Sequence, residues 1–176
     1  MLAVISGCGS ASREPGAHMM GGGSEYHYSS LRCAAPSTPP GRTVDVSLGD
    51  MGMTRMMGGL VPAGEHMMLT AVPAEAPAGQ VTLVVSNRGW RTHELVILPL
   101  GAEAQPGPIS AGSDGKVPEA ASLGEVSKSC AAGSGEAITA GAVGRTTVSL
   151  TAGRYELMCN LRNHYANGIH HELVVV

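Results

Sequence analysis

The sequence predicts an all-β protein, a Greek-key β-sandwich of about seven to eight strands. Its 176 residues include 25 glycines and 11 prolines, which favour short strands joined by turns over long helices. Several short segments alternate apolar and polar residues or stay apolar over five or six positions. No long helical pattern and no internal repeat interrupts them, so two packed sheets are the expected architecture.

The predicted strands lie in the second half of the domain as well as the first. Thr43–Leu48 shows the clearest alternation, and Pro99 is expected to end the fourth strand. The segment Thr151-Ala152-Gly153 is predicted to be a hairpin turn. Residues 101–135 are rich in Gly, Ala, Ser and Pro and are expected to form a long loop that covers a surface or serves a function. In chain order, the predicted strands are Thr43–Leu48, Met67–Val72, Val81–Ser86, Glu94–Leu98, Val143–Leu150, Arg154–Met158 and Glu172–Val176.

Composition and charge restrict the possible partners. Charged residues make up 14% of the chain and the net charge is −3, so nucleic acid is not an expected partner. Phe is absent and aromatic residues make up 3%, so the core must come from aliphatic residues and Met. No apolar segment is long enough to span a bilayer. We expect a monomer.

The first 42 residues are expected to lie outside the folded domain. The run Ile5-Ser6-Gly7-Cys8 resembles the lipobox of bacterial lipoproteins, in which the cysteine becomes the acylated first residue. The stretch lacks a cationic start and its apolar part is short. Either residues 1–8 are a truncated signal whose start codon has been assigned too late, or Cys8 is an ordinary tail residue. The first is favoured because residues 9–42 read as a Gly/Ser/Pro-rich linker, as a tether would. The domain would then span residues 43–176 and face the periplasmic side of the cell membrane, held there by a lipid.

The C-terminal region carries the strongest chemical signal. Cys159 ends a short apolar run, and His164 follows in a polar loop before the last strand. A thiolate and an imidazole on one loop between two strands form half of a site for a soft metal. The candidate for the second imidazole is His93, at the start of an earlier strand.

These segments resemble the cupredoxins, small blue-copper β-sandwich proteins, and in particular their sulfocyanin-like and lipoprotein-type members. The family's C-terminal pattern YELxCNLPxHYxxGM is similar to Tyr155–Leu161 and His164–Gly168, and its histidine strand is similar to Thr92–Leu98. The resemblance spans roughly residues 43–176. It implies one type 1 copper with His93, Cys159 and His164 as equatorial ligands.

The sequence departs from that pattern at two positions. Arg162 stands where the family often has proline, and Ile169 stands where it has the axial methionine. An aliphatic side chain cannot coordinate, so the site would be trigonal or would take a water or carbonyl oxygen. Loss of the thioether should raise the reduction potential. His170 or His171 is the alternative ligand, and His171 is the one on the same strand face as Ile169. The trigonal site is favoured.

The four cysteines form no CxxC pair. If Cys159 is a ligand and Cys8 is acylated, Cys33 and Cys130 remain. In an exported protein an isolated pair is most simply a disulfide, and two free thiols are the alternative.

A methionine-rich segment allows a second metal site. Thioethers suit Cu(I), so the cluster is a candidate cuprous site, but Met also fills core gaps in a chain without Phe, and that reading is favoured. The residues of this cluster are Met51, Met53, Met56, Met57, His66, Met67 and Met68.

Four functions follow from these features. The favoured one is a membrane-tethered, extracytoplasmic blue-copper electron carrier with an unidentified redox partner protein. The second is a copper-handling protein that delivers or sequesters Cu(I) through the methionines. A copper enzyme would need further His-rich centres, and the sequence has no His-x-His pair. A relative that has lost its metal is the fourth, and Ile169 is the one hint of it.

Overall fold

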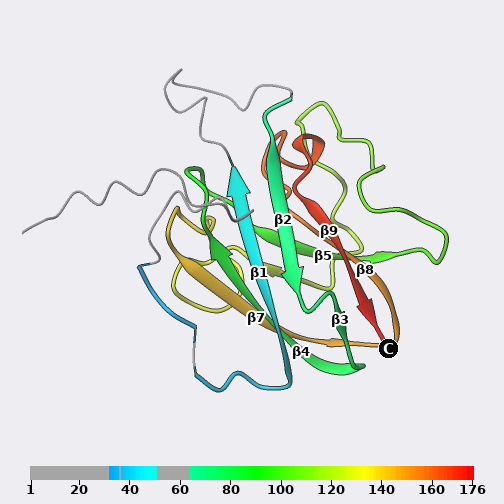
Figure 1. The fold of residues 1–176 in the computed structure, drawn as a ribbon. Coiled ribbons are helices and arrows are strands. Elements are labelled where there is room, and N and C mark those ends of the chain that lie inside the picture. Colours follow the sequence, from blue (N-terminus) through cyan, green and yellow to red (C-terminus); the bar gives the residue numbers. More distant parts are fainter. Residues whose placement is uncertain (1–31, 36, 51–63) are drawn as a thin grey trace, which may run out of the picture.

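Two mixed β-sheets pack face to face in the computed structural model, which describes residues 32–35, 37–50 and 64–176 (Figure 1). The first sheet has the strand order β2-β1-β4-β7 and the second β3-β9-β8-β5-β6. The predicted β-sandwich is therefore confirmed. Its strands are β1 (Arg42–Asp50), β2 (Met67–Val72), β3 (Glu75–Ala76), β4 (Gly79–Asn87), β5 (Leu95–Leu100), β6 (Gly124–Val126), β7 (Val143–Leu150), β8 (Gly153–Met158) and β9 (His170–Val175), with a short 3-10 helix at Tyr165–Asn167.

The first sheet forms because its central strands present an apolar face to the second sheet. In β1 the side chains of Val44, Val46 and Leu48, at alternate positions of the strand, are buried in the core. β1 pairs parallel with β4 and antiparallel with β2, and β4 pairs antiparallel with β7. β1 is therefore an interior strand of the first sheet, between β2 and β4, and its last residue, Asp50, is buried.

In the second sheet, Leu95–Leu98 of β5 is buried on both faces, which explains the unbroken apolar run there. Leu95 and Ile97 face the core between the sheets, whereas Val96 and Leu98 join a second apolar cluster. That cluster includes Val117 from the long segment after β5. The segment thus covers the outer face of the sheet, as expected from its length and composition.

Two expectations about strand boundaries and turns are wrong. Pro99 does not end its strand, because β5 continues to Leu100 and Pro99 pairs with Tyr155 of β8. β6 pairs only with Leu95–Ile97, so the other side of β5 is open at Pro99 and a residue without an N–H is tolerated there. The segment 101–135 is also not free of strands, because it contains β6.

The predicted hairpin at Thr151-Ala152-Gly153 is wrong as well. β7 and β8 lie in different sheets, so the chain crosses from one layer to the other at this point. The Tyr155 hydroxyl donates a hydrogen bond to the Thr151 carbonyl at 2.7 Å, which fixes the corner. Tyr155 and Leu150 are both buried in the core, so the crossing lets two consecutive strands face the same interior from opposite sides.

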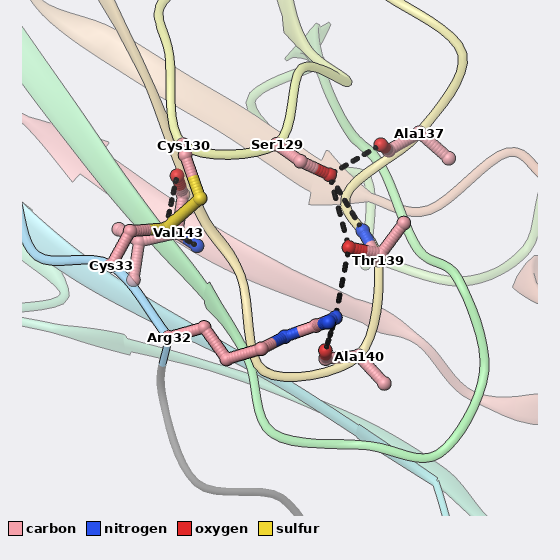
Figure 2. Close-up of a disulfide and its surroundings, with 8 residues drawn as sticks. All are labelled: Arg32, Cys33, Ser129, Cys130, Ala137, Thr139, Ala140 and Val143. Carbon is pink, nitrogen blue, oxygen red and sulfur yellow. Dashed lines mark hydrogen bonds between the residues drawn. A yellow bond between two sulfur atoms is a disulfide. The ribbon is translucent and has the colours of Figure 1, made fainter.

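A disulfide joins Cys33 to Cys130, across a sequence separation of 97 residues (Figure 2). The backbone N–H of Val143, at the start of β7, lies 3.3 Å from the Cys33 sulfur. Arg32, next to Cys33, donates hydrogen bonds to the Thr139 hydroxyl and the Ala140 carbonyl. Within the described residues, no helix is long and apolar enough to cross a membrane.

Candidate metal centre

Three buried side chains from separate parts of the chain meet at one end of the sandwich. Among the described residues, His93, Cys159 and His164 form the group of potential ligands close enough to share a metal ion. His93 precedes β5 and Cys159 follows β8, its neighbour in the sheet, while His164 lies at the start of the 3-10 helix. The three residues that the sequence singled out are therefore brought together.

The spacing of the donor atoms fits a metal ion. Cys159 Sγ lies 3.8 Å from His93 Nδ1 and 3.4 Å from His164 Nδ1, and the two Nδ1 atoms are 3.2 Å apart. A point equidistant from these three atoms is about 2.0 Å from each, close to the bonds of roughly 2.0–2.3 Å that transition metals such as zinc make to nitrogen and sulfur. The side chains thus converge at coordination distance without rearrangement.

The backbone holds His93 firmly. Its N–H donates to the Ile138 carbonyl at 3.0 Å, and the Ile138 N–H donates back at 2.7 Å. Its Nε2 lies 2.9 Å from Asp50 Oδ2, and both side chains are fully buried. Burial by itself raises the pKa of Asp50, but hydrogen bonds from His93, Arg91 and Trp90 outweigh it and leave that pKa lowered.

Cys159 is buried on the core face, in line with Leu157 of β8. Its N–H donates to the Ile169 carbonyl at 3.1 Å, and the Glu94 N–H approaches its sulfur at 3.4 Å. Burial raises the pKa of the thiol to about 12 in the metal-free protein. A metal ion must therefore displace the thiol proton when it binds.

His164 and Glu94, the two ionisable groups beside the thiol, differ in charge at neutral pH, because His164 is uncharged whereas Glu94 is partly ionised. Burial, and then the nearby His93 and Arg91, lower the pKa of His164 to about 3, so its imidazole is neutral. Burial also raises the pKa of Glu94 to about 7; Lys116 opposes the rise, and Glu119 and Glu125 add to it. A neutral imidazole has the lone pair that a metal needs.

The loop between Cys159 and His164 is tied to the long segment after β5. The Asn160 side chain exchanges two hydrogen bonds of 2.8 Å with the backbone of Val117 and also donates to Glu119. The Asn163 N–H donates to the Gly115 carbonyl at 2.9 Å. This loop therefore holds its shape with Arg162 in the position where a proline was expected from the resemblance.

The remaining predicted site residues lie elsewhere. Ile169 is fully buried in the core, and His171 in β9 is not part of the group of three. Met67 is buried in the core, Met68 is half-buried and His66 is exposed, so Met67 fills the interior as a gap-filling residue does. Cys8, Met51, Met53, Met56 and Met57 lie outside the described residues.

The sequence reasoning missed Asp50, Glu94 and Asn160. Asn160 and Glu94 directly follow two of the predicted ligands, and that proximity was a usable signal. Asp50 had no such signal, because it is 43 residues from His93 and belongs to the other sheet. Only the packing of the two sheets brings it to the site.

The comparisons with known proteins found solved structures alone. Neither a protein-family model nor a curated protein matches the chain. Rusticyanin from Thiobacillus ferrooxidans is similar at 17% identity, over 77% of this chain and 79% of that chain, with a TM-score of 0.44. Auracyanin from Roseiflexus castenholzii is similar at 16% identity, over 76% and 96%, with a TM-score of 0.46. Auracyanin A from Chloroflexus aurantiacus, a "blue" copper protein, is similar at 17% identity, over 76% and 99%, with a TM-score of 0.44.

Proposed function

We propose that this protein is an extracytoplasmic one-electron carrier with a single type 1 copper held by His93, Cys159 and His164. The observation that supports it most is the buried triangle of two imidazole nitrogens and one sulfur, with sides of 3.2, 3.4 and 3.8 Å. Two histidines and one cysteine in a trigonal arrangement are the donor set of electron-transfer copper sites.

The same donor set argues against a structural zinc site. Structural zinc is almost always bound by four protein ligands, and three such groups converge here among the described residues. Ile169 stands at the position of the resemblance's axial ligand and offers only hydrocarbon. A three-donor site with no strong fourth ligand fits copper better.

Copper bound at this centre supplies a one-electron couple between Cu(II) and Cu(I). The chain's residues keep the donor atoms in place for both states. Backbone hydrogen bonds join His93 to Ile138 and Cys159 to Ile169. Hydrogen bonds of the Asn160 side chain hold the loop that connects Cys159 to His164. Burial of all three donors excludes water, so little has to move when the charge changes.

The visible spectrum of the Cu(II)-loaded protein tests this function. We expect an intense thiolate-to-copper band at the red end of the visible range, and we expect Cys159→Ser to lack it. His171→Ala is the matched control, because it removes a nearby imidazole outside the group of three and should keep the band. Reversible reduction and reoxidation at one copper per chain is the accompanying result.

Other spectra would change the proposal in defined ways. A red band alone agrees with a non-coordinating Ile169. A strong second band at shorter wavelength that His171→Ala removes would make His171 a ligand. If the wild-type protein shows no such band, it is not a blue-copper carrier.

The cellular location is part of the same proposal. The disulfide between Cys33 and Cys130 supports an oxidising compartment outside the cytoplasm. The lipobox-like run before Cys8 supports a lipid anchor on the cell membrane, from which the domain would exchange electrons with a partner protein.

Fatty-acid labelling tests the anchor. In bacteria expressing the gene with its upstream sequence, we expect a labelled fatty acid to be incorporated into the wild-type protein and not into Cys8→Ala. A Cys33→Ala variant should still be labelled, because it removes a cysteine that we assign to the disulfide. Equal labelling of the wild-type protein and Cys8→Ala would contradict lipidation at Cys8.

A further inference from the structure

A buried carboxylate from the first sheet contacts a ring of the candidate metal centre in the second. Asp50 is the last residue of β1, and its Oδ2 lies 2.9 Å from His93 Nε2. Both side chains have no exposed surface. A carboxylate in such a place is costly unless its oxygens accept hydrogen bonds.

Three donors converge on one oxygen of Asp50. Besides His93, the backbone N–H groups of Trp90 and Arg91 donate to Oδ2 at 2.9 and 3.0 Å. The loop approaches so closely that a Cβ at Gly89 would clash with the same oxygen. This cradle of two backbone donors suits an ionised carboxylate, which only accepts hydrogen bonds.

The cradle decides which nitrogen of His93 carries the hydrogen. Because the carboxylate accepts, Nε2 must donate, and the neutral ring then keeps its lone pair on Nδ1. Nδ1 is the atom 3.2 Å from His164 Nδ1 and 3.8 Å from Cys159 Sγ. The hydrogen bond to Asp50 thus points the free lone pair at the centre of the donor triangle.

A charged acceptor also changes the strength of the ligand. A carboxylate that accepts the N–H hydrogen makes the imidazole a more basic ligand and places a fixed negative charge near the ion. Both effects favour the more highly charged oxidation state. The electrostatic effect is strong here because neither group is in contact with water.

We propose that Asp50 is a positioning residue that fixes the tautomer of His93 and stabilises Cu(II) relative to Cu(I), which lowers the reduction potential of the centre. The effect of Asp50 on the reduction potential rests on the proposed electron-carrier function. The effect of Asp50 on the tautomer of His93 concerns the metal-free protein and does not depend on that function.

The potential is measured for Asp50→Asn, which keeps an oxygen acceptor of similar shape and removes the charge. Loss of a side chain that hydrogen-bonds to a metal ligand typically weakens metal binding 10- to 100-fold, and here the loss should fall on Cu(II). At 59 mV for each tenfold change in a one-electron couple, the potential should rise by about 60–120 mV. The thiolate-to-copper band should persist, because Cys159 is untouched.

Asp45→Asn is the matched control. Asp45 lies on the same strand and is exposed, so the substitution removes the same charge at a solvated position. Its Cu(II)-to-Cu(I) affinity ratio should change less than twofold. Equal potentials in Asp50→Asn and Asp45→Asn would overturn the electrostatic part of the proposal.

The tautomer is measured in metal-free protein by 15N NMR of the imidazole. We expect His93 to carry its hydrogen on Nε2 in the wild type and to shift toward the Nδ1–H form in Asp50→Ala. An unchanged ring in folded Asp50→Ala would overturn the positioning role. Absence of a blue band in wild-type protein would remove the electron-carrier function but would leave this NMR result interpretable by itself.

Discussion

Replacing Cys33 and Cys130 together by serine is expected to lower the free energy of unfolding by about 4–5 kcal/mol. The disulfide closes a sequence separation of 97 residues, and a cross-link around a loop of that length removes much of the freedom of the unfolded chain. The expected value follows from the chain-entropy relation, in which the stabilisation grows with the logarithm of loop length. Urea denaturation of the oxidised wild type and of the double variant measures it.

Arg32→Ala is the control for this experiment. It removes hydrogen bonds to Thr139 and Ala140 next to the disulfide while the cross-link stays in place (Figure 2). These bonds are exposed, so their loss should cost only about 1 kcal/mol or less. If the double serine variant is no less stable than Arg32→Ala, the cross-link does not restrict the unfolded chain.

Metal affinity is expected to rise about tenfold per pH unit between pH 7.5 and 9.5. The pKa of the Cys159 thiol in the metal-free protein is raised to about 12, so every ion that binds must release the thiol proton. Over this range His164, with a pKa of about 3, is already neutral, and Glu94, with a pKa of about 7, is mostly ionised. One proton should therefore leave for each metal bound, and the affinity should follow the hydroxide concentration.

Competition with a chelator, using redox-inert Zn²⁺ as the probe, measures this slope. Cys159→Ser should bind the ion with an affinity that barely depends on pH, because the serine hydroxyl loses no proton. A flat profile for the wild-type protein would mean that a thiolate is already present in the metal-free centre, and that burial does not control its ionisation.

The strands with a clear apolar pattern could be predicted from the sequence because such a pattern is local. Met67–Val72 and Val143–Leu150 have the predicted bounds, since alternating or continuous apolar residues determine which positions are buried. The two-residue β3 and three-residue β6 are too short to show any period. The corner after Leu150 was mistaken for a hairpin because a short Gly-containing link has the same composition whether it joins two strands of one sheet or crosses between sheets.

The candidate ligands could be named in advance because two of them share one loop and the third opens a strand with a recognisable pattern. The environment of those ligands could not. Asp50 reaches His93 through the parallel pairing of β1 with β4 and the packing of two sheets. Neither can be recognised from the residues around Asp50 in the sequence. The pKa values of Cys159 and Glu94 likewise come from burial, which depends on the whole fold.

The hydrogen bond between the Cys159 N–H and the Ile169 carbonyl makes the closure of the loop independent of the side chain at position 169. It is made by backbone atoms, so it closes the ligand loop whatever side chain stands at position 169. The side chain there is fully buried in the core, so hydrocarbon and thioether side chains of similar volume can be exchanged while this backbone hydrogen bond stays in place. In the proposed copper protein, such variants would share this backbone hydrogen bond and differ in reduction potential, so the dependence of electron-transfer rate on potential could be measured on one fold.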